Sequence, residues 1–251
     1  MGELTLTKGN EVEELRALKQ VPLIAVIGSR KTSEPYNREL GMIVGNSLRS
    51  TIEYPHNGTI YTGGAPGVGE DVAMGVARYV LEEYRKTGQL LDPRFFIMIP
   101  PKIGDTGDGR YIDEPFGPTK IYRAAGAFSP SAELDIVWAG EGLAERREIL
   151  AKSADMAVML HGSAGTLDEA YYVLANGRPV IVMSNSGDGA KWLSNLKSHR
   201  LPRSEDVPED ILPTLNKILT ETDTYLIIPV SAIHEVREEV FSRIRMYDSP
   251  Y

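Results

Sequence analysis

The sequence predicts an α/β protein with a doubly wound, mostly parallel Rossmann-like sheet and helices on both faces. Apolar runs of strand length alternate with segments of helical periodicity along most of the chain. The apolar runs are continuous, as in strands that are covered on both faces. Three of them end in glycine beside a small or hydroxyl residue, which is typical of strand-to-helix turns at the carboxyl edge of a parallel sheet.

The expected elements follow one another in a regular order. Residues 1–20 are charged and predict a short lead-in helix. The predicted strands are 22–29, 59–64, 95–101, 133–140, 155–162, 178–185 and 224–229. The predicted helices are 34–50, 70–85, 141–154, 166–175, 211–221 and 231–247. Such alternation implies right-handed crossovers within one sheet.

One domain with additions at both ends accounts for this pattern. The lead-in helix over 1–20 precedes a Rossmann-like nucleotide-binding domain over 21–199, and 200–251 form a C-terminal extension packed on the same domain. Residues 102–131 are rich in Gly, Pro and Asp. So long an irregular segment is usually a lid, a binding loop or a disordered insert.

Composition excludes several classes of protein. The 251 residues carry 35 acidic and 27 basic side chains, and the net charge of −8 opposes binding to nucleic acid and to anionic membranes. The absence of cysteine excludes disulfides, thiolate zinc sites and a cysteine nucleophile. No segment has the apolar length of a membrane span or the apolar core of a signal peptide, and the four histidines lack metal-ligand spacing. We therefore expect a cytoplasmic protein without a metal or cofactor.

Three glycine-rich turns that follow predicted strands form a candidate phosphate site. Glycine lets the backbone approach a ligand closely, and the helix after each turn offers unpaired N–H groups to an anion. Tight strand-to-helix turns also require glycine for packing alone. The chain has neither G-x-x-x-x-G-K-[ST] nor G-x-G-x-x-G after its first strand. The candidate residues are Gly28, Ser29, Gly63, Gly64, Gly67, Gly162, Ser163, Ala164, Gly165 and Thr166.

Charged residues lie on both sides of the third turn. Thr166 is placed to cap the following helix or to donate to a phosphate oxygen. Asp168 and Glu169 fall in the first predicted helical turn, where the helix dipole favours carboxylates. Arg146 and Arg147 begin the preceding helix near the same sheet edge, where an arginine can hold a phosphate through two hydrogen bonds. The alternative without a ligand is that the two arginines are solvated and that the two acids only stabilise the start of the helix.

Two of these segments resemble motifs of the lonely guy family of phosphoribohydrolases, also known as possible lysine decarboxylases, within the SLOG superfamily of Rossmann-like nucleotide-binding proteins. The family carries E-R-K and P-G-G-x-G-T-x-x-E, and this chain reads ERR at 145–147 and HGSAGTLDE at 161–169. The separation from Arg146 to Glu169 is 23 positions (169 − 146), which matches the family spacing. His161 and Ser163 depart from the pattern and indicate a divergent member. The likeness covers about residues 21 to 183.

The resemblance implies hydrolysis of the N-glycosidic bond of a purine nucleoside 5′-monophosphate to free base and ribose 5-phosphate. In that reaction Glu169 would stabilise an oxocarbenium-like transition state and orient a water, while Arg146 positions Glu169 or the ribose. The turn from Gly162 to Thr166 would hold the phosphate. His161 is either a structural residue or a proton donor to the leaving base. The resemblance also implies a homodimer or higher homo-oligomer that acts on a small molecule.

Two other functions fit the same sequence. The altered turn and the long insert favour a non-catalytic carrier of a nucleotide or of a phosphorylated pterin, similar to molybdenum-cofactor carriers, whereas the retained arginine and glutamate favour an enzyme. A single-strand DNA binder of the same fold is the third interpretation. Net acidity and the lack of an aromatic and basic stripe count against it.

Overall fold

A computed structural model describes most of the chain. The described residues are 3–18, 22–53, 56–64, 66–89, 91–92, 94–99 and 135–248. The predicted insert at 102–131 lies outside them.

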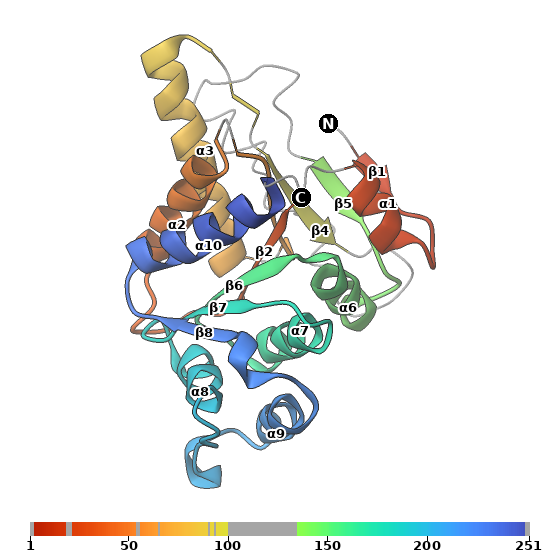
Figure 1. Cartoon of the computed structure of the whole chain (residues 1–251), viewed down its shortest axis with the longest axis vertical. Coiled ribbons are helices and arrows are strands. Elements are labelled where there is room, and N and C mark those ends of the chain that lie inside the picture. Colours follow the sequence, from red (N-terminus) through yellow and green to blue (C-terminus); the bar gives the residue numbers. More distant parts are fainter. Residues whose placement is uncertain are drawn as a thin grey trace.

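One parallel sheet runs through the described part of the chain (Figure 1). Its eight strands have the order β1-β5-β4-β3-β2-β6-β7-β8, and each neighbouring pair is parallel. The strands are β1 (Glu3–Thr5), β2 (Leu23–Gly28), β3 (Thr59–Thr62), β4 (Phe95–Ile99), β5 (Asp135–Trp138), β6 (Met156–Leu160), β7 (Val180–Met183) and β8 (Ile227–Val230). The predicted fold class is confirmed.

Helices cover both faces of this sheet (Figure 1). One face packs against α1 (Glu11–Leu18), α6 (Leu143–Ser153), α7 (Ala164–Ala175), α8 (Asp188–Leu196) and α9 (Leu212–Glu221). The other packs against α2 (Arg38–Thr51), α3 (Val68–Thr87) and α10 (Ile233–Asp248). Short 3-10 helices lie at Ser204–Asp206 and Thr224–Leu226. Because both faces are covered, the central strands are buried on both sides, which explains their continuous apolar sequences.

The position of β2 determines where a ligand can bind. From β2 the chain builds the sheet outward through β3, β4 and β5, then returns to add β6 on the other side of β2. The strand order therefore reverses between β2 and β6, where Gly28 pairs with Leu160. In open parallel sheets the crevice for ligands forms at the carboxyl ends of strands at such a reversal.

Several element boundaries differ from the prediction. The described part of the first twenty residues contains the strand β1 as well as the predicted helix. This strand was missed because a three-residue edge strand leaves no apolar run in the sequence. Helix α8 was not predicted, since the proline breaks that follow it dominated the pattern. Residues 224–226 form a 3-10 helix before β8 rather than its first half. Helix α7 begins at Ala164, two residues before the predicted start, and this shift changes the interpretation of the site.

Candidate functional site

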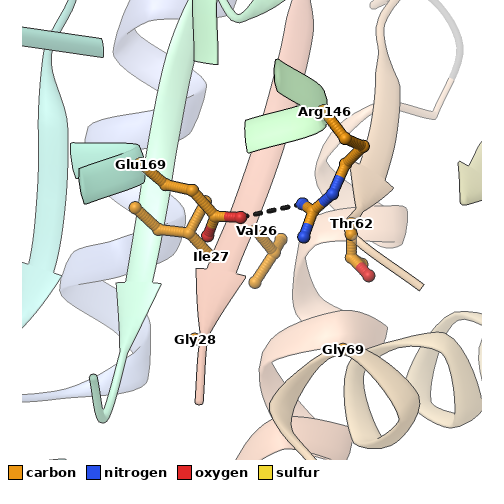
Figure 2. A pocket seen from close by; sticks show the side chains of 8 residues that line it. Val26, Ile27, Gly28, Thr62, Gly69, Arg146 and Glu169 are labelled. Atoms are coloured by element: carbon orange, nitrogen blue, oxygen red, sulfur yellow. Dashed lines mark hydrogen bonds and ion pairs between the residues drawn. The ribbon is translucent and has the colours of Figure 1, made fainter. Parts of the chain in front are cut away.

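The central feature of the site is a buried ion pair between α6 and α7. Arg146 Nη1 donates to Glu169 Oε1 at 2.8 Å (Figure 2). The two side chains are only 6% and 9% exposed. The structure thus brings together the two residues that the sequence singled out at a separation of 23 positions.

Gly63, directly after β3, leaves the space that the Arg146 guanidinium occupies. A Cβ atom on Gly63 would lie 2.4 Å from Arg146 Nη1, so the guanidinium occupies the space that any other residue would fill. A cavity of about 40 Å³ borders the pair; it is lined by Val26, Ile27, Gly28, Thr62, Gly63, Gly69, Arg146 and Glu169 (Figure 2). This volume suits one or a few waters, whereas pockets for small-molecule ligands span roughly 300–1,000 Å³. Thr62 and Gly69 were not among the predicted site residues, although both lie close in sequence to the selected glycines.

The electrostatics of the pair are set by burial. Burial raises the pKa of the Glu169 carboxyl above its ordinary value, and the charges of Arg146 and Arg147 oppose that rise. Arg146 Nε is buried and has no hydrogen-bond partner. The arginine therefore has a donor left over after it has paired with Glu169.

Unpaired buried polar atoms gather at this edge of the sheet. Within the described residues, the buried side-chain atoms without a hydrogen bond are Ser29 Oγ, Arg146 Nε and His161 Nδ1. Ser29 follows β2, His161 follows the adjacent β6, and Arg146 borders the same cavity as Gly28. Buried polar groups in folded proteins are nearly always paired, so this concentration indicates a place where a ligand or water completes the hydrogen bonding.

The predicted phosphate turn forms the start of α7. Ser163 is the N-cap in extended conformation, and its carbonyl accepts from the N–H groups of Thr166 and Leu167. The N–H groups of Ala164 and Gly165 have no acceptor inside the helix. A Cβ atom on Gly165 would lie 2.6 Å from Arg147 Nη2, so this guanidinium lies directly against the first helical turn. Free N–H groups beside an arginine form a suitable anion site.

The expected cap at Thr166 and first-turn position of Asp168 are wrong. Because α7 begins at Ala164, Thr166 is its third residue and the two acids lie in the second turn. Asp168 accepts a hydrogen bond from Thr214 Oγ1 of α9 at 3.0 Å and lies 3.8 Å from Arg147 Nη1. Its interactions thus link α7 to α9 and α6 rather than stabilising the helix end.

His161 adopts a conformation that the sequence did not reveal. Its φ is 60°, in the left-handed region, and its N–H donates to Ser186 Oγ at 2.7 Å. The ring Nε2 lies 3.2 Å from Ser33 Oγ and accepts from the Ser33 N–H at 3.4 Å. Burial lowers the pKa of the imidazole, and the charge of Asp188 partly opposes this.

The remaining selected glycines serve local packing. A Cβ atom on Gly28 would lie 2.5 Å from Val68 Cγ1, and one on Gly162 would lie 2.4 Å from Met159 Cε. Gly67 is the N-cap of α3 with a φ of 86°, and Gly64 has a φ of 68°. These positions require glycine whether or not a ligand approaches them.

The described residues hold neither a metal cluster nor a membrane-spanning helix. No group of three or more His, Asp or Glu side chains that could hold a metal ion is found among them. Of the helices in the described ranges, none combines the length and apolar character that crossing a bilayer requires.

Comparisons with known proteins support the resemblance. Residues 122–210 match the model of the SLOG cluster4 family, a range that contains the described strands β5 to β7 together with Arg146 and Glu169. This match bears out the predicted resemblance to SLOG proteins over that part of the chain. No curated protein matches the chain.

Solved structures show the same fold. The X-ray structure of TM1055, a structural genomics target, is 18% identical with a TM-score of 0.54, covering 88% of this chain and 99% of that one. The molybdenum cofactor binding protein from the phototrophic bacterium Rippkaea orientalis is 19% identical with a TM-score of 0.50, covering 89% of this chain and 97% of that one. At these identities the likeness concerns the fold alone.

Proposed function

We propose that this SLOG-type chain binds a nucleoside 5′-monophosphate at the carboxyl end of β2 and hydrolyses its N-glycosidic bond, releasing base and ribose 5-phosphate. The observation that carries the proposal is the buried pair of Arg146 and Glu169 beside a water-sized cavity. A carboxylate held next to a water has the chemistry that an oxocarbenium-like transition state requires.

The phosphate would bind at the start of α7. The N–H groups of Ala164 and Gly165 offer two donors, the helix end is electropositive, and Arg147 contributes a guanidinium against Gly165. These local groups can hold an anion despite the negative charge of the whole chain. Fixing the phosphate also fixes the sugar relative to Glu169 on the same helix, which supplies the orientation that catalysis needs.

Glu169 and Arg146 would act together on the sugar. The Arg146 charge opposes the rise that burial causes in the pKa of Glu169, and the ionised carboxylate would stabilise positive charge as the bond from the anomeric carbon to the base nitrogen breaks. A water in the cavity would add its oxygen to the anomeric carbon and lose one proton, and the departing base would take up one proton, so that water is consumed and no net proton is released. The nucleotide itself lies over the sheet edge, because the cavity is too small for it.

The test is release of free base from a panel of nucleoside 5′-monophosphates. Glu169→Gln is expected to lower kcat by about 100-fold or more, since it removes a charge that stabilises the transition state. Asp168→Asn is the matched control, because it alters the adjacent acid, which points to α9 instead. Cleavage of none of the monophosphates, or release by Glu169→Gln at the wild-type rate, would rule out the hydrolase.

A carrier without catalysis is the second candidate, and one observation favours it. Glu169 is already paired with Arg146 in a nearly closed environment, as expected of a structural ion pair that ligand binding leaves undisturbed. The structural similarity to the molybdenum cofactor binding protein of Rippkaea orientalis supports a phosphorylated pterin as the alternative ligand. Calorimetry would then record tight binding of the ligand with no base released.

A further inference from the structure

Two of the unpaired buried atoms belong to residues that directly follow β2 and β6, where the strand order reverses. Gly28 of β2 pairs with Leu160 of β6, and Ser29 and His161 are the residues that come after this pair. Ser29 is 2% exposed and His161 is 8% exposed. Ser29 Oγ and His161 Nδ1 each lack a hydrogen-bond partner.

The contacts of the ring determine which nitrogen carries the proton. The Ser33 backbone N–H can only donate, and it points to Nε2, so Nε2 is the acceptor. Burial lowers the pKa of the imidazole, which keeps the ring neutral near pH 7. The proton therefore resides on Nδ1, and His161 presents a buried N–H without an acceptor.

Contacts on the backbone and on the ring hold His161 in this orientation. The backbone N–H of His161 is bound to Ser186 Oγ, which in turn donates to the Met183 carbonyl. A Cβ atom on Gly187 would lie 2.5 Å from His161 Cδ2, so the ring packs closely against that glycine while Nε2 contacts Ser33. A buried donor held in this way without a partner is destabilising, so its presence points to an acceptor from outside the protein, either a ligand atom or a water that a ligand atom can replace.

We propose that His161 Nδ1–H and the Ser29 hydroxyl recognise the hydrogen-bonding edge of the ligand's heterocyclic base. This inference rests on the proposed nucleotide site and names the part of the ligand read by these two residues. A neutral N–H donor and a hydroxyl, which donates or accepts, suit uncharged acceptor and donor atoms on the edge of a heterocycle. The nearby acidic residue Asp188 disfavours a phosphate at this position, whereas the start of α7 offers N–H groups and Arg147 to a phosphate.

The experiment distinguishes the role of Nδ1 from that of Nε2. The His161→Asn amide nitrogen can replace Nδ1 and loses the contact to Ser33, while the His161→Gln amide group reaches toward Ser33 and loses the Nδ1 donor. Asparagine also tolerates a φ of 60°. Affinities are measured by calorimetry for a panel of nucleoside 5′-monophosphates and for ribose 5-phosphate, which lacks a base.

We expect wild type to bind its preferred monophosphate more tightly than ribose 5-phosphate. His161→Asn keeps that preference, and His161→Gln reduces it by about tenfold, the value of one hydrogen bond, with ribose 5-phosphate affinity unchanged. Equal losses for ribose 5-phosphate and the monophosphate would mean that His161 reads the phosphate. Loss of preference in His161→Asn alone would mean a structural role through Ser33. Either result overturns the inference.

Two further variants keep the test sharp if His161→Gln does not fold. Ser29→Ala is expected to lower the base preference in the same way, and an unchanged preference overturns the proposal. Ser33→Ala retains the backbone N–H that fixes the tautomer, so its preference stays at the wild-type value. Because these are binding measurements, a preference without base release would refute the hydrolase and leave the inference standing.

Discussion

Gly63→Ala tests whether the end of β3 makes room for the buried arginine. The new methyl group would lie 2.4 Å from Arg146 Nη1, and ordinary van der Waals contact begins at 3.4 Å, so the guanidinium must retreat by about 1 Å. Such a shift disrupts the 2.8 Å bond to Glu169. Breaking a buried ion pair costs about 3–5 kcal/mol, and a catalytic group displaced by about 1 Å can lose on the order of 100-fold in rate. We expect an unfolding free energy lower by up to that amount.

The assay is urea unfolding of Gly63→Ala in two backgrounds. In the wild-type background the substitution should lower the unfolding free energy by the full amount given above. In a chain that also has Arg146→Met and Glu169→Gln, no guanidinium meets the methyl group, so the cost should fall to about 1 kcal/mol or less. Gly142→Ala is the control, since a Cβ there meets no atom within 4 Å. An equal cost of Gly63→Ala in both backgrounds would refute the reasoning.

Three other predictions concern stability and pH. Gly165→Ala should leave stability unchanged or raise it by about 1 kcal/mol, because alanine favours a helix, while displacement of Arg147 weakens nucleotide affinity in calorimetry. Asp155→Ala should lower the unfolding free energy by about 1–3 kcal/mol in urea, because its fully buried carboxylate accepts from the first N–H of β2 and from Arg16 at 2.8 Å each, and the variant leaves that N–H unpaired; unaltered stability would contradict this. The unfolding free energy of wild type minus that of His161→Asn should fall as pH falls below 6.5, by at most about 1.4 kcal/mol per pH unit.

The sign of that pH dependence follows from the lowered pKa of the imidazole. In the unfolded chain the histidine takes up a proton near its ordinary value of 6.5, while the folded chain resists protonation to a lower pH. Between these values the unfolded state binds more protons, so acidification favours unfolding. Urea unfolding of both proteins from pH 7.5 to 5 measures the difference, and a difference that stays constant would show that burial does not perturb the ring.

The sequence was sufficient for the parallel sheet except its edge strand β1, because continuous apolar runs identify strands that are covered on both faces. The association of Arg146 with Glu169 was implied by the family resemblance, through the spacing of two motifs. The cap of α7 was mislocated because Ser163 and Thr166 are both good capping residues, and only the backbone geometry distinguishes them.

Other features depend on contacts between segments far apart in the chain. His161 combines a left-handed backbone with hydrogen bonds to Ser186 and Ser33, which lie 25 and 128 positions away. Asp168 meets Thr214 across 46 positions. No local pattern records such partners, so the roles of these side chains could not be read from periodicity or from a motif.

Helix α7 carries both the proposed phosphate-binding N–H groups and the proposed catalytic carboxylate. Ala164 lies at the anion-binding start and Glu169 five residues later, which corresponds to about 7.5 Å along the axis. The distance between these two positions is therefore fixed by the helix, and it can change only if part of the helix unwinds. If the proposed function holds, we expect selection of a ligand whose anionic group and reacting carbon are spaced to match that length, and exclusion of longer polyphosphate chains, which would shift the sugar along the helix.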